Sequence, residues 1–195
     1  NRLVENLLDM SRLQAGALHL NLERFLVEDV VDAALESLAT DRRHVALGEF
    51  DDVPEIIADP VLLERVLANL IGNALHHGGT AAPVLLTASA LEDEVQLRVI
   101  DRGPGVQPQD FEQIFTPFQR LGDRDNTTGV GLGLALSRGL VEAMGGSLTP
   151  EETPGGGLTM VVTIPVAAPA SVTPPSAASV PAPAGESTET PQLPT

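Results

Sequence analysis

The chain has 195 residues, 43% of them hydrophobic, a length that suffices for one well-buried domain with appendages. Its formal net charge of -16 argues against a nucleic-acid-binding or anionic-membrane-binding surface, which would be repelled over most of the protein. The absence of cysteine excludes disulfides, thiolate catalysis and cysteine-based zinc sites.

The first predicted element is an amphipathic helix over residues 1–18, whose leucines and Met10 recur at helical spacing. This apolar stripe needs a partner helix. We favour the incomplete end of a dimerisation hairpin whose first helix is missing, because the apolar pattern is already under way at residue 1, as expected for a fragment. The alternative is a helix that packs on its own domain. Gly16 breaks the pattern, and the alternation of Leu18, Leu20 and Leu22 with polar residues then predicts a strand.

A second helix is predicted over 27–38, because helical spacing returns there and two acidic residues occupy the first turn. Short strands are predicted over 45–50 and 55–58. Asp59-Pro60 then signals the start of a third helix, which Gly78-Gly79 ends.

This third helix, predicted to end near His77, is the element around which the chain is organised. Its polar residues Asn69, Asn73 and His76 recur at spacings of four and three, so they form a row of groups able to bind metal or phosphate. An ordinary core helix with two solvated amides is the alternative. The apolar stripe predicted to face the core consists of Leu63, Val66, Leu67, Leu70, Ile71 and Ala74.

Strands are predicted over 84–90 and 95–101, followed by a segment to 133 that is rich in Gly, Pro, Asp and Arg, with a short helix at 110–115. A helix over 132–144 and strands over 147–149 and 158–164 close the domain. Residues 166–195 are Pro, Ala, Ser and Thr with few large apolar side chains, which predicts a disordered tail. No stretch of about eighteen apolar residues and no leader is found, so neither a membrane span nor a signal peptide is expected.

Two glycine motifs follow. Asp101, Gly103 and Gly105 come directly after a predicted strand. A carboxylate at the end of a strand can bind a ligand, and the two glycines let the backbone approach that ligand closely. The alternative is a turn with a helix-capping aspartate. The second motif, at 129–133, leads into a helix and can cradle phosphate. It lacks the flanking features of a dinucleotide fold and the Lys-Ser/Thr of a P-loop; a flexible hinge is the alternative.

Taken together, residues 1–165 resemble the ATP-binding domain of two-component sensor histidine kinases, in the GHKL superfamily shared with gyrase, Hsp90 and MutL. The N box is similar to NLIGNA at 69–74, the first glycine box to DRGPG at 101–105, the phenylalanine box to FTPF at 115–118 and the second glycine box to GVGLG at 129–133. LLDMSRLQAG at 7–16 resembles the end of the second dimerisation helix. This segment and GLALSRGLVEAMGG at 133–146 are most similar to the Kdp-type potassium- and turgor-responsive sensors.

The resemblance implies ATP and Mg²⁺ as ligands, with Asp101 accepting a hydrogen bond from the adenine amino group, Asn73 binding Mg²⁺ and Asn69 lying beside the γ-phosphate. Asn69 and Asn73 are the implied catalytic residues. Residues 121–128 would form a mobile lid. The further nucleotide-binding positions that it implies are His76, His77, Gly103, Gly105, Arg120, Gly129, Val130, Gly131, Leu132, Gly133 and Thr159.

The sequence departs from the family pattern in two places. His76 and His77 stand where the family usually has Lys and Tyr, and histidine carries an uncertain charge near neutrality. The phosphoacceptor histidine of the hairpin is absent: His19 follows Gly16 in a predicted strand, so we reject it as the acceptor.

We therefore expect an α+β fold, a two-layer sandwich of a mixed, largely antiparallel sheet with helices on one face. The expected domains are 1–18, the dimerisation helix end; 19–165, the ATP-binding domain; and 166–195, the tail. The resemblance implies a protein-histidine kinase fragment that is not competent alone for autophosphorylation. Its implied partners are the dimerisation domain of its own homodimeric parent, in the bacterial cytoplasmic membrane, and a response regulator, with no nucleic acid and no direct membrane contact.

Two other functions stay open. A self-contained ATPase of the gyrase kind is disfavoured by Asn69, because such enzymes place there a glutamate that activates water. A dimerisation module that no longer binds nucleotide is disfavoured because Asp101, Asn73 and the loop glycines are intact.

Overall fold

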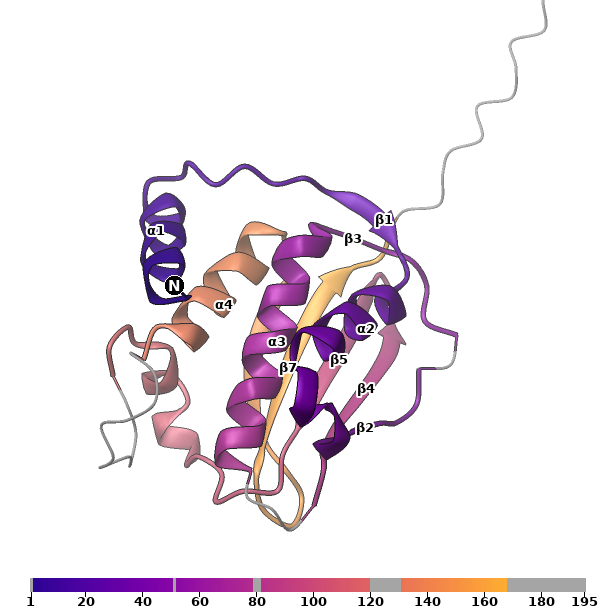
Figure 1. Ribbon diagram of the computed structural model, residues 1–195. Coiled ribbons are helices and arrows are strands. Elements are labelled where there is room, and N and C mark those ends of the chain that lie inside the picture. Colours follow the sequence, from indigo (N-terminus) through magenta and orange to yellow (C-terminus); the bar gives the residue numbers. More distant parts are fainter. Residues whose placement is uncertain (1, 51, 79–81, 120–130, 168–195) are drawn as a thin grey trace, which may run out of the picture.

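The computed structural model describes residues 2–50, 52–78, 82–119 and 131–167, and in this part of the chain the helices lie on one face of a five-stranded sheet (Figure 1). The strand order is β2 (Val45–Leu47), β4 (Val84–Leu91), β5 (Glu94–Ile100), β7 (Leu158–Pro165) and β6 (Ser147–Glu152). Strand β2 runs parallel to β4, and the other neighbours are antiparallel. The predicted mixed, largely antiparallel α+β sandwich is confirmed. A separate two-stranded sheet joins β1 to β3.

The helices and strands match the predicted order except at residues 18–22 and at 110–115, where two 3-10 turns replace the predicted short helix. The helices are α1 Arg2–Gln14, α2 Val27–Ser37, α3 Pro60–His77 and α4 Gly133–Ala143, with short 3-10 turns at Ala39–His44, Pro108–Asp110 and Gln113–Phe115. The strands are β1 Glu23–Phe25, β2 Val45–Leu47, β3 Ile56–Ala58, β4 Val84–Leu91, β5 Glu94–Ile100, β6 Ser147–Glu152 and β7 Leu158–Pro165. Within the described ranges, no helix combines the length and the apolarity that crossing a bilayer requires.

Helix α3 forms the centre of the core. It packs between α2 and α4 over β4 and β5, and its predicted stripe is buried, with Leu63, Val66 and Leu67 fully inaccessible. Asp59 caps its N-terminus by accepting a hydrogen bond from the Leu62 amide at 3.1 Å. Alternating residues of the sheet complete this core: Val84, Leu86, Ala88, Val95, Leu97, Val99, Leu148, Met160, Val162 and Ile164.

Two sequence predictions need correction. Residues 18–22 form no strand: the backbone amide of Asn21 donates to the Asp59 carboxylate at 2.8 Å instead of to a neighbouring strand, and β1 begins at Glu23. The predicted tail also starts two residues too early. The amides of Val166 and Ala167 donate to the carbonyls of Asp93 and Glu55, both at 2.8 Å, so these two residues belong to the domain. The rest of the predicted tail lies outside the described residues.

Helix α1 packs against its own domain with part of its apolar stripe. Met10 and Leu13 pack on the core, and Leu13 lies so close to Gly139 of α4 that a Cβ added there would be 3.0 Å from Leu13 Cδ1. The opposite face of α1 stays exposed at Val4, Leu7 and Leu8. The helix thus has one apolar face used within the domain and a second one left in solvent.

An ion pair ties α1 to α3. The Arg65 guanidinium bonds the Asp9 carboxylate and also donates to Asn6 Oδ1 at 2.8 Å, and the Asp9 side chain is only 13% exposed. Replacing Asp9 by alanine should lower the free energy of unfolding by about 2 kcal/mol, as expected for charged hydrogen bonds that are shielded from water. Chemical denaturation measures this loss.

Asp32→Ala is the matched control for that prediction. Asp32 faces Arg42 at 4.0 Å, and both side chains are more than half exposed, so its loss should change the free energy of unfolding by less than about 0.5 kcal/mol. Equal effects of the two substitutions would show that Asp9 does not anchor α1.

Candidate functional site

One polar face of α3 carries the first group of candidate residues. Asn69 and Asn73 lie one turn apart and both are half-buried. Asn69 Nδ2 donates to the hydroxyl of Ser137 on α4 at 2.9 Å, whereas no hydrogen bond within the described residues engages the Asn73 amide. His76 and His77 are exposed at the end of the helix, with their rings perpendicular at a centroid distance of 4.6 Å.

Asp101 stands at the end of β5 and is 7% exposed. Its Oδ1 accepts hydrogen bonds from two backbone amides, those of Gly103 at 2.8 Å and Leu158 at 3.1 Å. Its Oδ2 accepts none from the described residues. The carboxylate is therefore fixed by one oxygen and presents the other as a hydrogen-bond acceptor.

Glycines bring the end of α3 against the Asp101 loop. A Cβ on Gly103 would stand 2.3 Å from the His77 carbonyl oxygen, and one on Gly78 would stand 3.0 Å from the Cβ of Asp101. Because α3 rises 1.5 Å per residue, Asn69 and His77 are about 12 Å apart along the helix. A ligand that contacts both Asp101 and Asn69 must therefore be elongated.

The second glycine motif leads into α4 at the other end of this row. Gly131 has a φ of +72° and accepts a hydrogen bond from the Phe118 amide at 2.9 Å. Leu132 is buried and occupies the N-cap position of α4, where its side chain makes no hydrogen bond. A Cβ on Gly133 would stand 2.5 Å from Asn69 Oδ1. The start of α4, with backbone amides suited to an anion, thus lies directly against Asn69.

The predicted site residues Arg120, Gly129 and Val130 lie outside the described residues, as does the predicted lid at 121–128.

Thr159 is not brought to this site. It pairs with Ile100 in the sheet, so its side chain projects on the face opposite to Val99 and the helices. There its hydroxyl lies 2.9 Å from that of Thr153. The neighbouring Leu158, through its backbone, is the residue that contacts Asp101.

Two residues of α4 that sequence reasoning missed support the site. Ser137 is 2% exposed and bonds Asn69; Arg138 stacks over Phe115, with its guanidinium carbon 4.7 Å from the ring centroid. Arg138 also bonds Glu112 at 2.8 Å and Glu142 at 3.1 Å, and the Glu112 hydrogen bond, above all, raises the pKa of the guanidinium. For Ser137 the available signal was its spacing of four residues from Gly133, which places both on one face of the helix.

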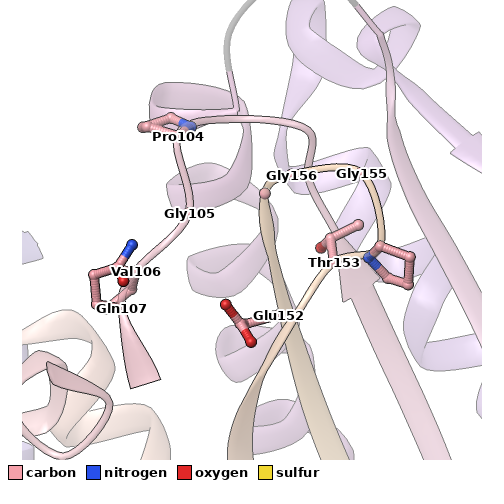
Figure 2. Close-up of a pocket in the computed structure, with 10 residues that line it drawn as sticks. Pro104, Gly105, Val106, Gln107, Glu152, Thr153, Gly155 and Gly156 are labelled. Atoms are coloured by element: carbon pink, nitrogen blue, oxygen red, sulfur yellow. The ribbon is translucent and has the colours of Figure 1, made fainter. Parts of the chain in front are cut away.

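A cavity of about 370 Å³ opens beside the Asp101 loop (Figure 2). Its walls are residues 104–107 and the glycine-rich turn 153–157, and Glu152 lies between these two segments. Gly105 is the one predicted site residue among its described lining residues. We place the functional site along α3 instead, because the amide and carboxylate groups able to recognise a nucleotide converge there and not in this cavity.

The residues fit a magnesium nucleotide. No group of three or more His, Asp or Glu side chains in the described ranges is arranged to hold a metal, so a cation here would depend on amide oxygens and on ligand phosphates. Mg²⁺ uses such a set, with few protein ligands, several waters and phosphate oxygens. Within the described residues, the Asn73 side-chain amide and one oxygen of Asp101 have no hydrogen-bond partner, and the N-cap of α4 makes no side-chain hydrogen bond; these are the groups that such a ligand needs.

Residues 58–168, more than half of the chain, match the family model described as "Histidine kinase-, DNA gyrase B-, and HSP90-like ATPase". Among curated relatives, the sensor protein KdpD of Rathayibacter rathayi is 51% identical over 165 residues, covering 85% of this chain and 19% of that protein. KdpD of Escherichia coli K12 is 39% identical over 84% of this chain and 18% of that protein. The chain thus spans about a fifth of the length of these relatives.

Solved structures agree on the fold. Full-length ShkA in complex with AMPPNP matches with a TM-score of 0.73 and 32% identity, over 86% of this chain and 36% of that one. The Acinetobacter baumannii histidine kinase AdeS matches with a TM-score of 0.69 and 23% identity, over 85% of this chain and 77% of that one.

Proposed function

The chain belongs to the histidine kinase-, DNA gyrase B- and HSP90-like ATPase family and holds the ATP-binding domain of a sensor histidine kinase, and from this premise we propose that it binds Mg·ATP along α3 for phosphoryl transfer to a histidine. The observation that carries the proposal is the alignment of Asp101, the Asn73 and Asn69 amides and the start of α4 along one helix. These groups match an elongated ligand with an adenine at one end and phosphates at the other.

Each residue has a distinct task in this proposal. Asp101 Oδ2 accepts a hydrogen bond from the adenine amino group, which selects ATP over GTP, while the glycines let the backbone approach the base. Asn73 offers its side-chain oxygen to Mg²⁺, and the backbone at Gly131 and Gly133 lies along the phosphates. When bound, Mg²⁺ would neutralise the negative charge that shifts between phosphate oxygens during the transfer.

The same residues favour transfer over hydrolysis. Asn69 is an amide and cannot act as a general base for water. An imidazole nitrogen of the acceptor is already a nucleophile when neutral, so the bond from the γ-phosphorus to the β–γ bridging oxygen breaks as a P–N bond forms, and ADP leaves. This chain then needs to align the reactants and does not need to remove a proton.

We expect the chain alone to bind Mg·ATP and to hydrolyse it only slowly. Adding a matching dimerisation hairpin from a relative, with radiolabelled ATP, should give label that is stable to base and labile to acid on the hairpin. Asn73→Ala should abolish that labelling. Fast steady-state hydrolysis without the hairpin would identify a self-contained ATPase, and absent nucleotide binding would identify a degenerate dimerisation module.

The partners and setting of the parent protein are part of this proposal. Similarity to KdpD sensor proteins favours potassium- or turgor-related two-component signalling, with a homodimeric parent in the bacterial cytoplasmic membrane and this domain on the cytoplasmic side. The rest of the dimerisation domain would pack on the exposed face of α1, at Val4, Leu7 and Leu8. A response regulator would receive the phosphoryl group.

A further inference from the structure

Ser137 lies on α4 one turn after Gly133, on the face that meets α3. It is 2% exposed, although serine is usually a surface residue. Its hydroxyl oxygen accepts a hydrogen bond of 2.9 Å from Asn69 Nδ2, across 68 residues of sequence. A buried hydroxyl is thus directed at the amide that the family resemblance places beside the γ-phosphate and metal-bound water.

This hydrogen bond fixes the place of the Asn69 carboxamide. With Nδ2 bonded to Ser137, Oδ1 lies on the other branch of the carboxamide, 2.5 Å from where a Gly133 Cβ would stand. Oδ1 accepts no hydrogen bond within the described residues. The hydroxyl on one side and the missing side chain on the other thus leave the carboxamide against the start of α4.

We propose that Ser137 is a positioning residue, which holds the Asn69 carboxamide at the start of α4, beside the metal-bound water and phosphates. An asparagine side chain without such a partner populates several staggered rotamers, so the carboxamide would leave this place in part of the molecules. A serine hydroxyl both donates and accepts hydrogen bonds, so it can hold the carboxamide by either end. This inference rests on the proposed function and deepens it.

The test compares nucleotide affinity with and without Mg²⁺, by calorimetric titration of ATP in magnesium buffer and in EDTA. Ser137→Ala should weaken binding in magnesium about tenfold, the effect of one hydrogen bond, and leave binding in EDTA unchanged. Ser37→Ala is the matched control: its hydroxyl bonds the Ala34 carbonyl at 2.8 Å in α2, so both affinities should equal those of the wild type.

The pair Ser137→Thr and Ser137→Val tests the hydroxyl without opening a cavity, because the two side chains have similar shapes. Threonine should retain most of the magnesium-dependent affinity and valine should lose it. A double-mutant cycle shows whether Ser137 acts through Asn69: in the Asn69→Ala background, Ser137→Ala should have no further effect.

Each contrary outcome is distinct. Equal losses in magnesium and EDTA, or losses that multiply in the cycle, would overturn the positioning role and leave the proposed function standing. Wild-type affinity in Ser137→Ala would do the same. A wild-type chain that does not bind Mg·ATP would overturn both.

Discussion

Replacing Asp101 by asparagine should weaken ATP binding about 30- to 150-fold, because one charged hydrogen bond contributes about 2–3 kcal/mol. An asparagine oxygen can still accept from the amides of Gly103 and Leu158, so the loop keeps its backbone ties. The amide then turns its NH₂ toward the adenine amino group, and two donors face each other. Calorimetric titration with ATP measures the loss.

Asp110→Asn removes the same charge further along the same connection, where the side chain is only partly buried and makes no hydrogen bond in the described structure. ATP affinity should be unchanged in that variant. Asp101→Ala should be worse than Asp101→Asn and should also lower the melting temperature, since it leaves both backbone amides without their acceptor. Wild-type ATP affinity in Asp101→Asn would remove this residue from the site.

Replacing Gly157 by alanine should both destabilise the domain and weaken ATP binding at least tenfold. Gly157 has a φ of +115°, and a Cβ there would lie 2.1 Å from the Asp101 carbonyl oxygen and 2.9 Å from the Cα of Arg102. The new methyl group must displace the loop that holds the Asp101 carboxylate. Overpacking adds about 1–3 kcal/mol to the cost of the left-handed backbone, so denaturation and ATP titration should both register the change.

Gly156→Ala separates the two causes. Its φ of +107° imposes similar backbone strain, of about 1–3 kcal/mol, but an added Cβ would meet nothing closer than 3.9 Å. It should lower stability and leave ATP affinity near that of the wild type. If Gly156→Ala and Gly157→Ala weaken ATP binding equally, the clash with Asp101 is not the cause.

Regular periodicity is what made much of the fold predictable. The bounds of α3 were predicted because an apolar stripe, a Pro at its first position and a glycine at its end agree locally. Residues 18–22 show the opposite case. Their alternation is that of a strand, but a strand needs a neighbour, and the Asp59 carboxylate takes the Asn21 amide instead.

The residues of the candidate site could be predicted from the sequence better than their arrangement in space. Asp101, Asn69 and Asn73 were identified from their glycine-box and N-box context, and the structure lines them up along α3. Thr159 was placed by resemblance alone, and the pleat turns it to the other face of the sheet, since a shift of one residue reverses a strand side chain. The apolar stripe of helix α1 predicts a partner helix. In the structure, part of this stripe packs against the domain to which α1 belongs.

The sequence by itself determined most of the helices and strands and indicated the boxes that make up the candidate site, because helical spacing, glycine stops and capping residues act between near neighbours. Only the tertiary structure decided which atoms are used: one Asp101 oxygen tied to the backbone of Gly103 and Leu158, and the Asn69 amide held by Ser137. The physical reason is distance along the chain. Asp101 and Leu158 are 57 residues apart, and Asn69 and Ser137 are 68 apart. Hydrogen bonds between such partners depend on how the packed core sets α3, α4 and the sheet against one another.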